Sequence, residues 1–148
     1  MLINMLLGLP TMILCLMLQV VWLIVMVRYY VGHRYLLDDP SHWPAIKLVS
    51  IVMMILVLGN LAQIAIWAFL FQFLGEFQRF DLAFYHSAVN FGSLGYGDIV
   101  MSDRYKLLGA LEAINGVLMI GVSTAALMTP FRDALQRSMT GKGLTPPN

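Results

Sequence analysis

The residues with the clearest chemical potential lie in the stretch from Ser93 to Asp98, which is held between two long apolar runs. Gly95 and Gly97 permit backbone conformations that are closed to other L-residues, so successive carbonyl groups can turn to one side of the chain. Carbonyl oxygens that face a common axis can replace the hydration shell of a cation. Since lipid satisfies no exposed N–H or C=O group, such a loop at membrane depth must be buried or line a watery cavity. The sequence therefore predicts that this loop lines a pore.

The same six residues, Ser-Leu-Gly-Tyr-Gly-Asp, resemble the Thr-Val-Gly-Tyr-Gly-Asp selectivity filter of potassium channels. The resemblance extends through Ala83-Phe84-Tyr85-His86, which is similar to the start of the family's pore helix. It continues through the stretch from Gly121 to Leu127, which is similar to the inner helix, and covers roughly residues 75 to 131. It implies a homotetramer, because one loop cannot surround an ion. It also implies that K⁺ is the permeant ion and binds between rings of backbone carbonyls, which are contributed by Ser93, Leu94, Gly95, Tyr96 and Gly97. No organic cofactor is expected.

Two departures from the family pattern affect the inner end of the loop. Gly92 and Ser93 stand where the family has two threonines, so a hydroxyl is kept but the entry to the filter is less rigid. Val89 stands where some members carry a buried glutamate behind the filter. These departures keep open the alternative of a weakly selective cation channel.

Three further residues are predicted to support the filter. By the resemblance, the Tyr85 hydroxyl hydrogen-bonds the Asp98 carboxylate at the outer end. Glu112 lies within an apolar run, where an unpaired charge costs roughly 2.5 to 3.5 kcal/mol at the helix centre. It is either a first-turn residue near the outer interface or a supporting carboxyl hydrogen-bonded near Asn90 or Ser93. His86 replaces a second aromatic residue, and ring packing is favoured over proton sensing.

The inner helix is predicted to contribute the cavity and the gate. Gly116 and Gly121 fall where the family carries inner-helix glycines, and each is either a gating hinge or a site of close helix packing. By the same resemblance, the residues expected to face the cavity and inner gate are Val117, Ile120, Thr124, Ala125 and Met128.

The elements that must position these residues are predicted from composition and apolar runs. With 59% hydrophobic residues, 11% charged residues and a mean hydropathy of +0.78, the chain is an integral membrane protein in contact with the lipid bilayer. The runs predict an all-α protein with three transmembrane helices, over residues 2–27, 46–74 and 107–128. Residues 81–91 are too short to span and predict a re-entrant pore helix between the second and third spans, with Asp81 as its N-cap.

The domain organisation follows from these elements. Residues 1–45 form an N-terminal helix and cytoplasmic turn, residues 46–131 the pore domain, and residues 132–148 a short cytoplasmic tail. The first span is extra to a two-helix pore and is expected to pack outside it. Asn60 and Gln63 share one face of the second span and are expected to join it to another helix. Pro130 is expected to stop or kink the third.

Basic residues predict the orientation. Six of them, Arg28, Arg34, Lys47, Arg132, Arg137 and Lys142, share one side, and three, Arg79, Arg104 and Lys106, share the other. The excess places the C-terminus in the cytoplasm and the N-terminus outside. The plasma (inner) membrane is the expected location.

Several function classes are excluded or disfavoured. The net charge of +1, without a basic cluster, gives no footprint for nucleic acid. Cys15 is the single cysteine, and no nucleophile–base set or metal-ligand spacing occurs, so an enzyme is not expected. The prediction is a potassium-selective channel that conducts K⁺ passively as a homotetramer. Besides a weakly selective cation channel, a non-conducting regulatory membrane subunit remains the alternative.

Overall fold

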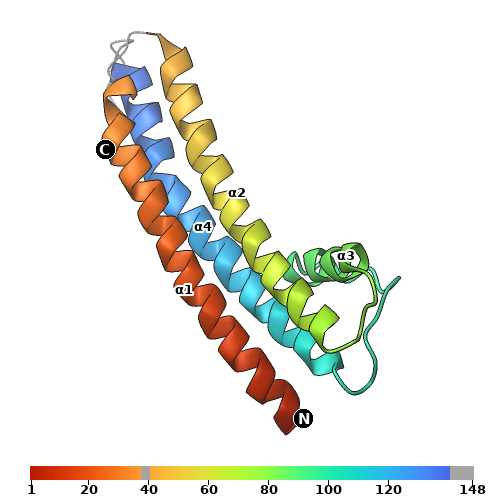
Figure 1. The fold of residues 1–148 in the computed structure, drawn as a ribbon. Coiled ribbons are helices and arrows are strands. Elements are labelled where there is room, and N and C mark those ends of the chain that lie inside the picture. Colours follow the sequence, from red (N-terminus) through yellow and green to blue (C-terminus); the bar gives the residue numbers. More distant parts are fainter. Residues whose placement is uncertain (38–40, 141–148) are drawn as a thin grey trace. The chain divides into compact units, whose positions relative to one another are not determined.

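The computed structural model describes residues 1–37 and 41–140, with side chains through residue 137. Its elements are α1 (Leu2–His33), a short 3₁₀ helix (Arg34–Leu37), α2 (His42–Phe73), α3 (Phe80–Phe91) and α4 (Lys106–Thr140), and no strand occurs in these ranges (Figure 1). Three helices, α1, α2 and α4, are long and apolar enough to cross a membrane. The predicted all-α class and the three spans are therefore confirmed. Residues 38–40 of the predicted cytoplasmic turn, and residues 141–148 of the predicted tail, which include Lys142, lie outside the described residues.

Several boundaries differ from the sequence expectation, and α1 continues to His33 rather than ending at residue 27. α2 begins at His42 and carries Pro44 in its first turn, where a missing N–H removes no helical hydrogen bond. α4 continues through Pro130 to Thr140, so the predicted stop at this proline is wrong. Asp81 is not the N-cap of α3, because Arg79 occupies that position and makes no side-chain cap bond. Asp81 lies in the first turn, where it accepts a 3.1 Å hydrogen bond from Arg79 Nε.

The chain divides into two compact units. Within the described residues, the first unit contains residues 1–20 and 59–121, and the second contains residues 21–37, 41–58 and 122–140. α1, α2 and α4 each contribute to both units, whereas α3 and the loop that follows it belong to the first.

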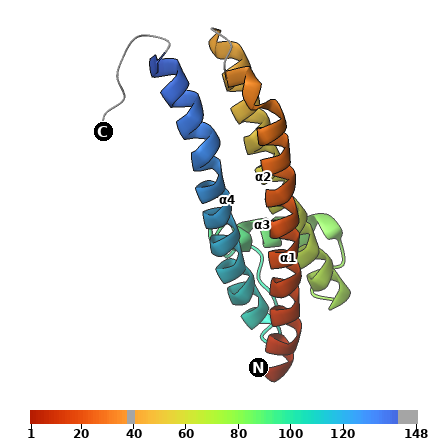
Figure 2. The same ribbon diagram turned by 90° about the vertical axis from the view of Figure 1, so that its left-hand side faces the viewer.

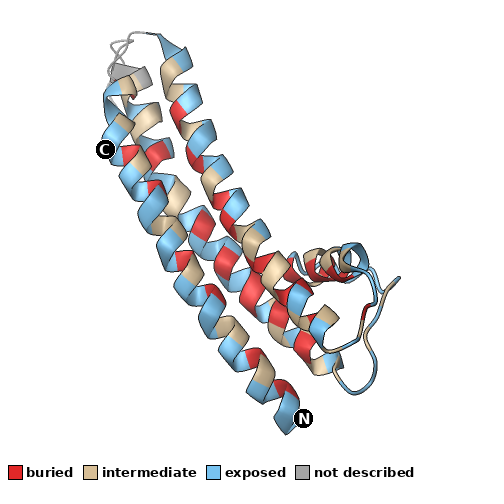
Figure 3. Cartoon of the chain, in the orientation of Figure 1, coloured by how far each residue is buried: buried red, intermediate tan, exposed pale blue. Residues whose placement is uncertain are grey.

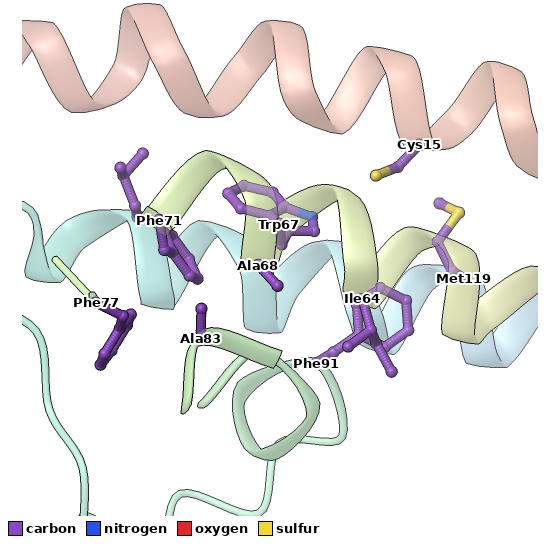
Figure 4. Packing of buried hydrophobic residues seen from close by; sticks show 10 residues of the cluster. Cys15, Ile64, Trp67, Ala68, Phe71, Phe77, Ala83, Phe91 and Met119 are labelled. Atoms are coloured by element: carbon purple, nitrogen blue, oxygen red, sulfur yellow. The ribbon is translucent and has the colours of Figure 1, made fainter. Parts of the chain in front are cut away.

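The core of the first unit fixes α3 against the two long helices beside it. Trp67 and Phe71 of α2 and Leu108 of α4 are fully buried in one cluster with Ala83 and Phe91 of α3 (Figure 4). α3 accordingly lies beside the C-terminal part of α2 and the N-terminal part of α4 in both views (Figure 1 and Figure 2). This packing positions the C-terminal end of α3 and the start of the loop.

α1 buries one narrow face and exposes the rest (Figure 3). The buried positions are Asn4, Gly8, Cys15, Gln19, Met26 and Tyr30. They repeat every 11 residues, which is three turns of about 3.67 residues and close to the natural helix period of about 3.6. The buried face therefore runs almost straight along the helix, and the exposed remainder is apolar except for Arg28.

The second unit has a smaller core. Met26, Tyr30 and Leu37 cluster with Leu48, Val52 and Leu56 of α2. The Tyr30 hydroxyl donates a hydrogen bond to the Asp133 carboxylate, which joins α1 to α4 in this unit.

Candidate functional site

The loop begins where α3 ends, and backbone hydrogen bonds set its direction. Ser93 N donates to Asn90 O at 2.8 Å, and Leu94 N donates to Val89 O at 2.9 Å. Gly92 has right-handed dihedrals, φ −76° and ψ −2°, so it closes the helix. Carbonyls at the C-terminal end of α3 carry the negative end of the helix dipole, which favours a cation nearby.

The backbone alternates within the loop. Ser93, Gly95 and Gly97 have φ values of 55°, 61° and 72°, so every second residue is in the left-handed region. Glycine adopts this region without steric cost, whereas a strained residue such as Ser93 costs on the order of 1 to 3 kcal/mol. All residues from Gly92 to Asp98 are exposed in the single chain. The five predicted ion-binding residues therefore lie together in one exposed segment with alternating conformation.

The outer end of the loop is attached to α3 at two adjacent positions. Tyr85 Oη donates a 2.8 Å hydrogen bond to Asp98 Oδ2, which is the pairing expected from the sequence. This bond raises the pKa of the Tyr85 hydroxyl. His86 Nδ1 lies 3.0 Å from Ile99 O. The bond from Tyr85 is present as predicted, while its role in filter support stays a prediction.

His86 is a buried ring that also carries polar bonds. It packs edge-on against Phe71, with 5.7 Å between ring centroids, and in a tilted arrangement against Phe77, with 5.0 Å between centroids. Since Ile99 O can only accept, Nδ1 carries the proton, and Nε2 accepts from Asn90 Nδ2 at 2.9 Å. Burial lowers the pKa of His86, which favours this neutral form. The ring packing preferred from the sequence is present.

Sequence reasoning missed a further attachment, between Glu76 and the segment that follows the loop. Glu76, in the connector between α2 and α3, accepts from Ser102 N at 2.7 Å and from Ser102 Oγ at 2.6 Å. Ser102 O in turn accepts from the backbone N–H groups of Tyr105 and Lys106, where α4 begins. No local motif signals this pairing, because 26 residues separate the two partners.

Glu112 is fully buried in α4, at 0% exposure. The polar side chains that face its carboxyl are Ser87 and Asn90 of α3, although neither reaches it with hydrogen-bonding geometry. The carboxyl is therefore covered by protein, while its depth in the membrane, near the outer interface or beside the filter, stays a prediction. The expected neighbour Asn90 is present.

Val89 offers no polar support behind the loop. It is 7% exposed and lines a pocket of about 420 Å³ together with Asn90, Gly95 and Gly97. The position that holds a glutamate in some potassium channels is thus apolar here, as the sequence indicates.

Packing distinguishes the two inner-helix glycines. A Cβ at Gly116 would lie 2.1 Å from the backbone oxygen of Phe91, so Gly116 allows α4 to contact the end of α3. A Cβ at Gly121 would meet nothing within 4 Å. The structure thus demonstrates close packing at Gly116. The residues predicted to face the cavity, Val117, Ile120, Thr124, Ala125 and Met128, are all exposed in the single chain.

The interhelical role expected for Gln63 is also present. Gln63 Nε2 donates a 2.7 Å hydrogen bond to Gln19 Oε1, which joins α2 to α1 within the first unit. Asn4 Nδ2 of α1 donates a 2.9 Å bond to Arg104 O, immediately before α4. The sequence identified Gln63 as a packing residue but gave no sign of its partner.

Comparison with known proteins gives one match. Residues 61–133 match a family described as Ion channel. This range contains the C-terminal part of α2, all of α3, the loop and most of α4. No curated protein and no solved structure matches the chain.

Proposed function

We propose that the protein, whose residues 61–133 match the family described as Ion channel, conducts K⁺ passively and selectively across a membrane through a homotetrameric pore. The observation that carries this proposal is the alternation of left-handed backbone at Ser93, Gly95 and Gly97 in an exposed loop. Such alternation lets consecutive carbonyls face one axis, where they replace the water around a dehydrated cation. The proposed ion ligands are the carbonyls of Ser93, Leu94, Gly95, Tyr96 and Gly97, with the Ser93 hydroxyl at the inner end.

The length of α3 supports a re-entrant arrangement. Its 12 residues extend about 18 Å at 1.5 Å per residue, which is too short for a hydrocarbon core of about 30 Å. We propose that α3 enters the membrane and stops within it, so that its C-terminal dipole favours a cation in the cavity. Non-helical backbone at that depth is stable when it lines water.

The apolar surface beside the loop supports self-assembly. Ile114, Val117 and Leu118 of α4 are 55%, 59% and 52% exposed, and they line a groove that includes Ser93. Four copies around an axis give a closed ring in which each loop completes the ion path. The proposed assembly would cover part of this surface with a second copy and leave part facing the cavity.

The proposed location is the plasma membrane, with the N-terminus outside and the C-terminus in the cytoplasm. The excess of basic residues on the side of Arg28, Arg34 and Arg132 supports this orientation. It places the Asp98 end of the loop outside.

The test is ion flux into liposomes that contain only this chain. K⁺ uptake well above Na⁺ uptake is expected for the wild type, and Gly95→Ala is expected to abolish it. Gly75→Ala is the matched control, because Gly75 has a similar φ of 77° and the same open surroundings but lies in the α2–α3 connector. Equal loss in both variants would indicate a general folding defect.

Two other outcomes favour the alternatives. Near-equal K⁺ and Na⁺ permeability in bi-ionic reversal potentials would identify a weakly selective cation channel, consistent with Gly92 and Ser93 at the loop entry. A tetrameric mass without barium-sensitive K⁺ flux would identify a non-conducting regulatory subunit.

A further inference from the structure

A group of buried polar atoms in the first unit makes no well-formed hydrogen bond, although polar side chains face one another there. The group comprises Trp67 Nε1 of α2, Ser87 Oγ of α3, and both side-chain polar atoms of Glu112 and of Asn115 in α4. Ser87, Glu112 and Asn115 are 0% exposed, and so is Trp67. Buried polar atoms are normally paired, so this concentration in one region requires an explanation.

These side chains belong to one site, and α1 contributes to it. Cys15 of α1 lies beside Trp67 and Asn115, while Ser87 and Asn90 lie beside Glu112. Figure 4 shows Cys15 projecting from α1 toward the part of α2 that carries Trp67. Four helices therefore surround the site, and the Cys15 side chain is itself 0% exposed.

Burying these polar atoms without good hydrogen bonds is energetically unfavourable. Each unpaired buried polar group costs about 1 to 3 kcal/mol, and a carboxyl costs more. Apolar cavities stay dry, whereas a polar cavity with two to four hydrogen-bonding partners holds water. Here the indole and amide N–H groups donate, and the hydroxyl, amide and carboxyl oxygens accept.

We propose that this site holds ordered water bonded to Trp67, Glu112 and Asn115, and that α1 closes it against lipid. This inference goes beyond ion conduction, because it gives the extra N-terminal span a definite role. Without α1, the carboxyl of Glu112 and the amide of Asn115 would approach lipid, which satisfies neither. The Gln63–Gln19 and Asn4–Arg104 bonds hold the same face of α1 in place.

The site is also connected to the loop. Asn90 adjoins Glu112 and donates to His86, and His86 donates to Ile99 O directly after Asp98. Water in the site therefore positions Asn90 through Glu112, and Asn90 positions the ring that holds the outer end of the loop. Glu112 acts here as a positioning residue.

The test uses Trp67 as its own reporter. In a Trp22→Phe, Trp43→Phe background, Trp67 is the only tryptophan, and its emission depends on whether the indole N–H is bonded to water. We expect red-shifted emission that shifts to the blue in Cys15→Leu, which fills the site. Cys15→Ser, similar in size and polar, is expected to keep the wild-type emission. Leu16→Phe, on the exposed face of α1 at 47% exposure, is the matched control.

A second variant covers the case in which Cys15→Leu does not fold. Asn115→Leu removes two polar atoms at nearly constant volume and is expected to give the same blue shift. A dry emission spectrum in the parent protein, unchanged in both variants, would overturn the proposal. A spectral shift on replacing K⁺ by choline would also overturn it, because the occupant would then be a cation.

The two proposals can fail separately. Fluorescence does not depend on conduction, so a dry Trp67 refutes the water site even when K⁺ flux is normal. Absent flux with a red-shifted Trp67 refutes the conducting function and leaves the water site standing. If both hold, Cys15→Leu is expected to reduce K⁺ flux at least several-fold, and Cys15→Ser is not.

Discussion

The hydroxyl of Tyr85 donates a 2.8 Å hydrogen bond to the carboxylate of Asp98, and this bond attaches the outer end of the loop to α3. The adjacent pair, His86 and Ile99, makes a second attachment one residue further along each segment. Two successive bonds restrain both the position and the rotation of the segment that leaves the loop. The outer end is therefore fixed by side chains, whereas the inner end is fixed by the backbone bonds of Ser93 and Leu94.

Removing the Tyr85 hydroxyl should weaken the outer end of the loop. We expect Tyr85→Phe to lower steady-state K⁺ flux and to shorten channel openings, because the Asp98 carboxylate loses a donor. In an Asp98→Asn background the same substitution should have a much smaller effect, as coupled partners show in a double-mutant cycle. Tyr35→Phe, at an exposed position distant in sequence, is the control. Additive effects of Tyr85→Phe and Asp98→Asn would contradict the coupling.

His86 should make stability depend on pH. Burial lowers its pKa below the ordinary 6.5, so the unfolded chain binds more protons than the folded chain in this range. The stabilisation is therefore present above about pH 6.5 and is lost as the pH falls through the lower folded pKa. Protonation would also remove the acceptor that Asn90 uses.

The measurement is the thermal unfolding midpoint in detergent across pH 5 to pH 8. The wild type should lose stability on the acid side. His86→Phe keeps a ring between Phe71 and Phe77 but does not titrate. Its unfolding midpoint should be lower than that of the wild type at neutral pH, and it should change less as the pH falls. An identical acid loss in both proteins would assign the effect to other groups, of which Glu76 and Asp98 are the nearest carboxylates.

Gly116 and Gly121 should respond oppositely to alanine. The 2.1 Å approach of a Cβ at Gly116 to the Phe91 backbone cannot be relieved by rotating a side chain. Gly116→Ala should therefore destabilise the fold by about 1 to 3 kcal/mol, as overpacking does. Gly121→Ala has open space and should stabilise the helix by roughly 0.5 to 1 kcal/mol.

Unfolding in a denaturing detergent titration compares the two glycine variants directly. Equal effects would mean that the contact between Gly116 and Phe91 is absent in the membrane. Single-channel recordings of Gly121→Ala, which folds, then test whether this position is a gating hinge.

Glu76 should control the mobility of the segment between the loop and α4. Glu76→Ala removes both acceptors of Ser102, and hydrogen bonds to charged groups contribute about 1.5 to 3 kcal/mol when sheltered. Because this pair is exposed, we expect only about a tenfold increase in hydrogen exchange at the Ser102 amide, which corresponds to about 1.4 kcal/mol. Glu76→Gln keeps one acceptor, so hydrogen exchange at its Ser102 amide should be faster than in the wild type and slower than in Glu76→Ala. Unchanged exchange in Glu76→Ala would show that the bond does not form in solution.

The three helices of spanning length, the short third helix and the loop can all be predicted from local sequence. Each depends on local chemistry: apolar runs of spanning length, a run too short to span, and glycines at positions 95 and 97. The bond between Tyr85 and Asp98 was also predictable, because the family resemblance supplies its partner. The stop expected at Pro130 is wrong, because α4 continues through this residue to Thr140, while a kink there stays a prediction.

The contacts of the buried polar residues, in contrast, follow from tertiary packing and cannot be predicted from local sequence. Helical periodicity shows that Gln63 and Glu112 occupy particular faces, but it cannot show which helix covers those faces. The partners of Gln63, Glu76 and Gly116 are distant in the sequence, and those of Gln63 and Gly116 come from other helices. The role of α1 depends on the same fact, because its buried face is defined by the polar groups that α2 and α4 present to it. Composition identifies a membrane helix, whereas packing determines what the helix protects.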